Sequence, residues 1–274
     1  MTGAVYLAAN ISDAFRLIFA RMLTMELTAK DLKYFEHRQD KAREFVGRFP
    51  GGIDFTGKRV LDIGCGHGAL TFHAAGAGAK EVVGLDVNAK LIGMADELLD
   101  ERFTDLRPRV SFRHRTIEDL NEQPFDIVLS QATFEHIEDP ASCLAAVNNN
   151  LSAGGRFYLG FGPLYNAPFG DHRRLNLPAQ KYFPWAHVSG THAQKISSYN
   201  RRHPGENISS LNDLGLNGLD YADYERMIDD CGLKKISYRV NTAAHPLVPV
   251  LNALRALPFL REYLSINIYA ILEK

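Results

Sequence analysis

The fold of this chain is decided by the stretch Val60-Leu61-Asp62-Ile63-Gly64-Cys65-Gly66-His67-Gly68-Ala69-Leu70. The branched apolar residues at its start are typical of a buried β-strand. Three alternate glycines let the backbone turn sharply and leave room for a ligand against the main chain. The helix expected next offers its free N–H groups to polar or anionic ligand atoms. The stretch therefore predicts a strand, a ligand-binding loop and a helix, although a glycine turn also serves simply to join a strand to a helix.

A second acidic residue favours the ligand-binding interpretation. The segment Glu81-Val82-Val83-Gly84-Leu85-Asp86-Val87-Asn88 is apolar until Asp86, which stands twenty residues after Gly66. An acid at the tip of the second strand accepts hydrogen bonds from both hydroxyls of an adenosine ribose. The alternative is that Asp86 caps a helix that begins near Ala89. The spacing favours the ribose.

Strand and helix patterns alternate along most of the chain, which predicts an α/β fold with a mostly parallel sheet and helices on both faces. We expect strands at 59–63, 81–86, 109–114, 125–130, 155–161, 234–241 and 265–273, the last two as a hairpin-like pair. We expect helices at 68–77, 88–102, 139–150 and 221–231, and two more before the first strand, one around Phe15–Leu23 and one over Ala29–Phe49.

The glycine pattern alone fits two cofactors, because Gly64-x-Gly66-x-x-Ala69 also satisfies the rule for nicotinamide dinucleotides. The surrounding sequence separates them. Asp62 precedes the first glycine by two residues, and Gly68 adds a third glycine. Further motifs follow in order: Phe125-Asp126-Ile127-Val128-Leu129-Ser130, Glu135-His136-Ile137 and Leu151-Ser152-Ala153-Gly154-Gly155-Arg156-Phe157. Over residues 58–161 this ordered set resembles the class I S-adenosylmethionine-dependent methyltransferases, in particular small-molecule enzymes of the methyltransferase-11 type.

The resemblance implies a Rossmann-like fold with a seven-stranded, mostly parallel sheet and an antiparallel last strand. It divides the chain into an N-terminal helical lid (1–56), a cofactor-binding core (57–161), a substrate-binding insertion after the fifth strand (162–219) and a C-terminal part of the core (220–274). Long loops in compact domains tend to be functional, which supports the assignment of the insertion. A helical segment at 246–264 packs on the insertion, forms a homodimer surface or touches a lipidic acceptor; packing is the leading interpretation.

The same resemblance implies S-adenosyl-L-methionine as the cofactor and assigns its binding residues. The glycines lie under the methionine part and the sugar, Asp62 places the amino acid end, and Asp86 binds the ribose. Either Thr116 or Glu118 accepts the adenine amino group. The full expected set is Asp62, Gly64, Cys65, Gly66, Gly68, Asp86, Val87, Asn88, Thr116, Ile117, Glu118, Ser130 and Gln131.

If the methyl acceptor is a hydroxyl, its proton must leave during attack, and a positioned histidine accepts it well near neutral pH. His172, next to Asp171, is the first candidate base, His136 the second and His187 the third. Each is also consistent with a structural histidine. Histidines with acids also bind Mg²⁺ or Mn²⁺, but the spacing is not that of a compact metal motif, so we predict no metal.

The insertion carries the residues expected to bind the acceptor. Aromatic side chains such as Tyr165 and Trp185 stack on a sugar or another ring. Arg173 suits a phosphate or carboxylate. We therefore expect O-methylation of a hydroxyl on a sugar, a glycan end or a secondary metabolite. The alternatives are N- or C-methylation of a small metabolite, and a protein that binds the cofactor without transferring its methyl group.

Composition sets further limits. The 274 residues contain 31 basic and 32 acidic side chains, which argues against a nucleic-acid partner. Cys65, Cys143 and Cys231 are odd in number and far apart, as expected for reduced thiols in a cytoplasmic protein. We expect no signal peptide or transmembrane segment, because charged residues interrupt the first apolar stretch.

Overall fold

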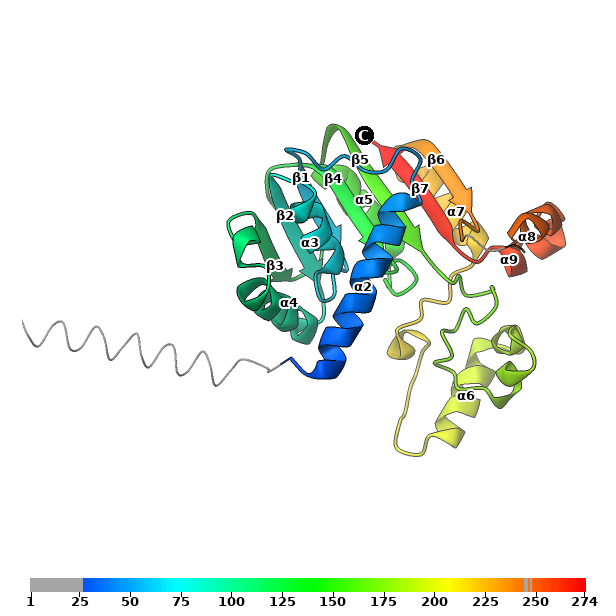
Figure 1. Ribbon diagram of the computed structural model, residues 1–274. Helices are drawn as coiled ribbons and strands as arrows, with labels where there is room; N and C mark the ends of the chain where they lie inside the picture. Colours follow the sequence, from blue (N-terminus) through cyan, green and yellow to red (C-terminus); the bar gives the residue numbers. More distant parts are fainter. Residues whose placement is uncertain (1–26, 244–245, 247) are drawn as a thin grey trace, which may run out of the picture.

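A seven-stranded sheet forms the centre of the protein, which we describe from a computed structural model over residues 27–243, residue 246 and residues 248–274 (Figure 1). The strand order is β3-β2-β1-β4-β5-β7-β6. Only β7 runs antiparallel to its neighbours, since it pairs in that sense with both β5 and β6. The predicted fold class is therefore confirmed. The helix expected around Phe15–Leu23 lies outside the described residues.

The elements follow the order expected from the sequence. The strands are β1 (Arg59–Ile63), β2 (Glu81–Asp86), β3 (Val110–His114), β4 (Phe125–Gln131), β5 (Leu151–Phe161), β6 (Lys234–Val240) and β7 (Ile268–Glu273). The helices are α2 (Ala29–Gly47), α3 (Ala69–Gly76), α4 (Ala89–Glu101), α5 (Pro140–Asn150), α6 (His192–Arg202), α7 (Tyr221–Asp230), α8 (Val248–Leu254) and α9 (Pro258–Leu264). Short 3-10 helices are η1 (Thr104–Leu106), η2 (Pro178–Lys181), η3 (Ala186–Val188) and η4 (Asn212–Leu214).

Two of the strand boundaries differ from expectation by more than one residue. β5 starts at Leu151 and not at residue 155, because Leu151 already pairs with Phe125 before the register shifts. β7 starts at Ile268 and not at residue 265, because Ser265 is engaged with the preceding helix. Its hydroxyl donates to the Arg261 carbonyl at 2.5 Å.

The sheet has an apolar core on each face. Neighbouring residues of β1 belong to different faces of the sheet. Val60 packs with α2, α3 and α4 on one face, and Leu61 packs with α5 and α7 on the other. This alternation is the period of two that a strand imposes. Phe72 of α3 stacks on Phe103 at 4.2 Å between ring centroids on the first face. The sheet is therefore buried on both sides, as a parallel sheet requires.

The carboxyl ends of the parallel strands bring distant loops together. β1 pairs with β4 so that Ile63 lies opposite Ser130, and the loops that follow both strands therefore start side by side. Gly64, at φ 71°, faces Thr133 of the second loop so closely that a Cβ atom would overlap the threonine side chain. Figure 1 shows the insertion with α6 beyond this same edge of the sheet.

The segment between β6 and β7 packs on its neighbours. The Glu262 carboxylate of α9 accepts the Tyr221 and Ala222 backbone N–H groups at 2.9 and 3.1 Å, which holds the start of α7. The Trp185 indole donates to the Tyr263 carbonyl at 3.1 Å. Of the helices within the described residues, none is both long and apolar enough to cross a membrane.

The core packing predicts a large penalty for truncating Phe157 of β5, whose side chain is fully buried. Phe157→Ala removes the ring and leaves a cavity, so we expect a loss of about 3–5 kcal/mol in the free energy of unfolding. Urea unfolding followed by circular dichroism measures it. The control is Phe259→Ala, whose side chain is 70% exposed, and there we expect a change within about 0.5 kcal/mol. Similar losses in both variants would contradict the described core.

Candidate cofactor and acceptor site

A cavity of about 1080 Å³ opens at the carboxyl edge of the sheet. Its walls come from the loops after β1, β2, β3, β4 and β5, with additional residues from α2 and from the insertion. Ligands of open α/β sheets bind at this edge, outside the ends of the strands. The cavity is therefore the candidate functional site.

The tip of β2 fixes the glycine loop. The Asp86 carboxylate accepts the Gly66 N–H at 2.9 Å and the Asn88 N–H at 2.8 Å. The Leu85 carbonyl accepts the Gly64 and Cys65 N–H groups at 2.8 and 2.9 Å. Asp86 lines the cavity. Since Asn88 is the residue that caps α4, the helix-cap alternative for Asp86 does not apply.

Asp62 lies under the loop and is almost completely buried. Its carboxylate accepts the Thr71 hydroxyl at 2.7 Å. Burial raises the pKa of Asp62 to about 7, and the nearby negative charge of Asp86 adds to this shift. Asp62 therefore exchanges its proton near neutral pH while it borders the cavity.

The loops after β2 and β3 form another wall of the cavity. Val87, Thr116, Ile117 and Glu118 all line it. The Thr116 hydroxyl donates to the Asp119 carboxylate at 3.2 Å. Ile117 is buried and offers an apolar surface, while Glu118 is exposed to solvent.

Three expected cofactor residues, Gly68, Asn88 and Ser130, are absent from the cavity lining. The last two have structural roles. The Asn88 side chain accepts the Lys90 and Leu91 N–H groups at the start of α4. Ser130 is fully buried and donates to the Ile63 carbonyl at 3.3 Å. The side-chain polar groups of Asn88 and Ser130 are thus already used within the fold, and their expected place beside the cofactor stays a prediction. Gln131 does line the cavity and also donates to the Lys41 carbonyl of α2 at 2.8 Å.

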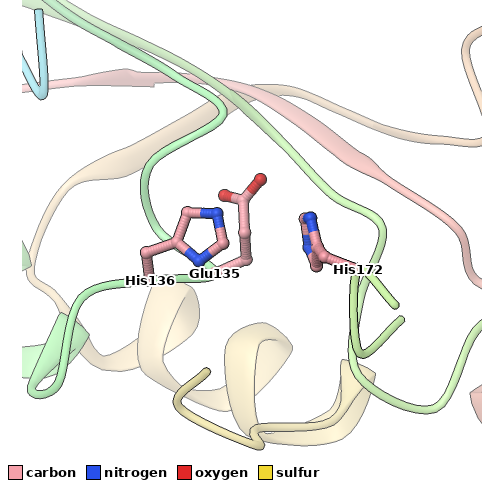
Figure 2. A group of neighbouring side chains, drawn as sticks. All are labelled: Glu135, His136 and His172. Carbon is pink, nitrogen blue, oxygen red and sulfur yellow. The ribbon is translucent and has the colours of Figure 1, made fainter. Parts of the chain in front are cut away.

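A polar cluster of Glu135, His136 and His172 lines the same cavity (Figure 2). Figure 2 shows the Glu135 carboxylate between the two imidazole rings. Glu135 is buried; one of its oxygens accepts the Gly162 N–H at 3.3 Å, and Oε2 has no hydrogen-bond partner among the described residues. Burial raises the pKa of Glu135 to about 7.

The two histidines of the cluster come from different segments. His136 follows β4, and its Nδ1 lies 2.7 Å from the Gly215 carbonyl. His172 belongs to the insertion, and the ring centroids of the two are 4.9 Å apart. Burial lowers the pKa of both rings, and that of His172 reaches about 4 with a further contribution from His136. Both imidazoles are therefore neutral at physiological pH.

The third catalytic candidate, His187, lies outside the cavity lining. Its ring is completely buried within the insertion, and Nε2 lies 2.7 Å from the Tyr165 carbonyl. Asp171 is buried beside it and accepts the Gln180 side-chain N–H at 2.5 Å and the Leu175 N–H at 3.3 Å. Asp171 therefore stabilises the insertion and does not orient His172.

The three residues expected to bind the acceptor also lie outside the cavity lining. Tyr165 is buried, with its hydroxyl 3.2 Å from the Lys195 amine. Trp185 is held by the C-terminal segment, as described above. Arg173 is exposed and stacks on Phe169, with its guanidinium carbon 4.6 Å from the ring centroid. The side chains of Tyr165 and Trp185 are therefore used in packing within the protein.

The cavity lining includes charged residues that the sequence-based set lacked, among them Arg38, Arg115, Glu135 and Arg174. Arg38 and Tyr34 are four residues apart on α2 and therefore share a helix face, and both line the cavity. The positive charge of Arg38 acts on the Asp62 and Glu135 carboxyl groups. In the sequence, the spacing of four residues between Tyr34 and Arg38 is the signal that could have placed Arg38 at the cavity.

The fold and the cavity define a class I methyltransferase domain. Residues 54–162 match the family model described as a methyltransferase domain. The resemblance inferred from the sequence is thereby confirmed.

Relatives with curated names include ubiquinone biosynthesis O-methyltransferases. The protein from Aromatoleum aromaticum is 40% identical over 105 residues, which is 37% of this chain and 43% of the relative. The protein from Aeromonas salmonicida is 32% identical over 149 residues, 53% of this chain and 58% of the relative. The alignments thus span about half the length of these relatives.

Solved structures share the fold over more of the chain. A protein described as an S-adenosylmethionine-dependent methyltransferase from Listeria monocytogenes is 22% identical, with a TM-score of 0.53 over 85% of this chain and 96% of its own. A magnesium protoporphyrin IX methyltransferase from Synechocystis PCC 6803, solved with S-adenosylhomocysteine, is 17% identical with a TM-score of 0.53, over 98% of this chain and 96% of its own.

The buried state of Asp62 predicts a pH effect on stability. The ordinary pKa of aspartate is 3.8, and the folded value is about 7. Between these values the folded state holds a proton that the unfolded state has released, so stability falls as pH rises, by up to about 1.4 kcal/mol per pH unit for this group. Asp62→Asn removes this pH dependence. The free energy of unfolding of the variant, minus that of the native protein, should therefore increase from pH 5 to pH 7.

Urea unfolding at pH 5, 6 and 7 measures the difference. The control is Asp54→Asn, because the hydrogen bond from the Thr56 N–H lowers the pKa of Asp54 and keeps its titration below this range. Parallel pH profiles for Asp62→Asn and the native protein would contradict the described environment of Asp62.

Proposed function

We propose that the protein is an S-adenosylmethionine-dependent methyltransferase that methylates a hydroxyl of a small molecule. One observation carries the proposal: a single cavity contains both the glycine loop with Asp86 and the cluster of Glu135, His136 and His172. The first set suits a nucleoside-containing cofactor, and the second suits a polar acceptor. A volume of about 1080 Å³ exceeds that of many single-ligand pockets, which is consistent with two ligands.

The residues present fit the cofactor. Asp86 is already oriented by the Gly66 N–H, and Val87 and Ile117 offer apolar surface on the adenine side. Asp62, Gly64 and Gly66 border the space for the methionine part. When bound, S-adenosylmethionine supplies an electrophilic methyl group on sulfur. The protein contributes by holding the two reactants in line and by limiting access of water.

A hydroxyl acceptor is favoured by the cluster. Neutral imidazoles beside a buried carboxyl group can receive a hydroxyl group through hydrogen bonds and can ease the loss of its proton. The named relatives are O-methyltransferases of ubiquinone biosynthesis, which favours a ring hydroxyl as acceptor over a sugar or glycan end. Arg38, Arg115 and Arg174 border the cavity as well, so an acceptor with an acidic group fits this site.

The test is the formation of S-adenosylhomocysteine from S-adenosylmethionine. We expect product with catechols or hydroquinones and none from amines of similar size, measured by mass spectrometry of both the cofactor and the methylated acceptor. Methylation of amines or carbon atoms in the same panel would replace the hydroxyl assignment. Tight cofactor binding without turnover on any class of acceptor would favour a non-transferring binding protein, since the same fold also occurs in the cyclase SpnF.

Asp86 provides a separate test of cofactor binding. Asp86→Ala removes a charged hydrogen-bond acceptor for the ribose and the bond that orients Gly66. We expect a loss on the order of 1.5–3 kcal/mol, which is about 10- to 150-fold in Kd. Titration calorimetry with S-adenosylhomocysteine measures it. Asp105→Ala, at an exposed position of η1, is the matched control with unchanged affinity. Equal Kd values for Asp86→Ala and the native protein would contradict the ribose assignment.

A further inference from the structure

We propose that Glu135, His136 and His172 bind a divalent transition-metal cation in the acceptor part of the cavity. The inference deepens the proposed function and rests on it for its catalytic meaning, but the metal site itself stands on the arrangement of these side chains. Each of the three offers one ligand atom, and these atoms lie within 4.8 Å of one another. This spacing leaves room for a cation between them after small side-chain rotations.

The hydrogen bonds around the histidines favour metal binding. His136 Nδ1 is hydrogen-bonded to the Gly215 carbonyl at 2.7 Å, which leaves Nε2 of the ring free to bind a metal ion. The Pro163 carbonyl accepts a hydrogen bond from the His172 ring, and Nε2 of that ring is buried with no partner among the described residues. Metal-binding histidines typically donate their second N–H to a carbonyl or carboxylate in this way, which fixes the tautomer and the ring orientation.

The carboxyl group supplies the third and independent observation. Glu135 Oε2 is buried and also has no hydrogen-bond partner within the described residues, and Figure 2 shows this carboxylate directed between the two rings. A buried carboxylate oxygen without a partner is costly. Glu135 and His172 thus each hold a buried atom without a partner among the described residues, and both belong to the group whose ligand atoms lie within 4.8 Å of one another. A cation bound by this group satisfies both.

The ligand set indicates the kind of metal. Two imidazole nitrogens and one carboxylate oxygen suit Mn²⁺, Fe²⁺, Co²⁺ or Zn²⁺, whereas Mg²⁺ and Ca²⁺ prefer oxygen ligands. Three protein ligands leave coordination positions open for solvent or an acceptor oxygen. Because the three ligands line the cavity, the open positions are accessible to the acceptor.

The metal changes the way in which the acceptor is activated. A hydroxyl bound to a divalent cation has a lowered pKa and releases its proton to solvent. Its oxygen then forms the bond to the methyl carbon as the carbon–sulfur bond breaks, so that the methyl ether, S-adenosylhomocysteine and one proton are the products. His136 and His172 act in this scheme as ligands, and the expectation that one of them is a general base gives way to it.

The experiment measures metal binding directly, without cofactor or acceptor. The full chain is dialysed against a chelator and then titrated with Co²⁺, whose visible absorption reports nitrogen and oxygen ligation, and with Mn²⁺ and Mg²⁺ by calorimetry. We expect one Co²⁺ and one Mn²⁺ per chain and much weaker Mg²⁺ binding. Absence of any saturable Co²⁺ or Mn²⁺ binding by the native protein overturns the proposal, whatever the behaviour of the variants.

Variants assign the ligands. Glu135→Gln keeps an oxygen for the Gly162 N–H but removes the charge, and His172→Gln removes one nitrogen ligand. Each should weaken Co²⁺ binding about 100-fold or more, given that even outer-shell changes cost 10- to 100-fold. His192→Gln, at an exposed histidine of the insertion, is the control and should bind as the native protein. Unchanged binding in folded Glu135→Gln and His172→Gln overturns the assignment; circular dichroism verifies folding.

Activity then separates the two proposals. If Co²⁺ binds at this site but no acceptor is methylated, the proposed function fails while the metal site remains. If the chelated protein methylates its acceptor at the full rate and added Mn²⁺ or Co²⁺ has no effect, a catalytic metal is overturned and the histidines return to the role of base. Loss of turnover on chelation with recovery on addition of Mn²⁺ supports the site and its place in the reaction.

Discussion

The hydrogen bond between the Asp86 carboxylate and the Gly66 N–H is the constraint on which the site depends. It joins the end of β2 to the loop after β1, and the Leu85 carbonyl adds two more bonds to the same loop. The loop therefore has its shape before any ligand arrives, which lowers the ordering cost of binding. The closeness of Gly64 to Thr133 extends this effect to β4, so one rigid unit carries the cofactor side and the start of the acceptor side.

The sheet and its flanking helices were predictable because the pattern of apolar residues in each segment agrees with the way in which that segment packs in the fold. Val60 and Leu61 alternate between two apolar clusters, and a glycine or polar residue ends each strand or directly follows it. Asp86 was located by its spacing from Gly66 alone. Such agreement between sequence pattern and fold is what allows a core to be inferred from one sequence.

The insertion was less predictable because its polar residues satisfy one another. Asp171 and His187 are conspicuous in sequence and yet are buried within that segment, bonded to Gln180, Leu175 and Tyr165. Sequence proximity suggested that Asp171 orients His172, but neighbouring side chains point in different directions. Glu135 was the reverse case. Its buried Oε2, which has no partner among the described residues, is recognisable only when its surroundings are known.

The origin of the cavity walls bears on how this protein diverges from its relatives. One side of the cavity is built by the loops at the strand ends of the sheet, whereas His172 and Arg174 come from the segment between β5 and α7. That segment has its own small apolar cluster of Tyr165, Leu175, Leu211 and Leu216. Substitutions there alter the acceptor pocket with little disturbance to the sheet. Under the proposed function, the acceptor preference can therefore change through this segment while the loops that suit the cofactor stay the same.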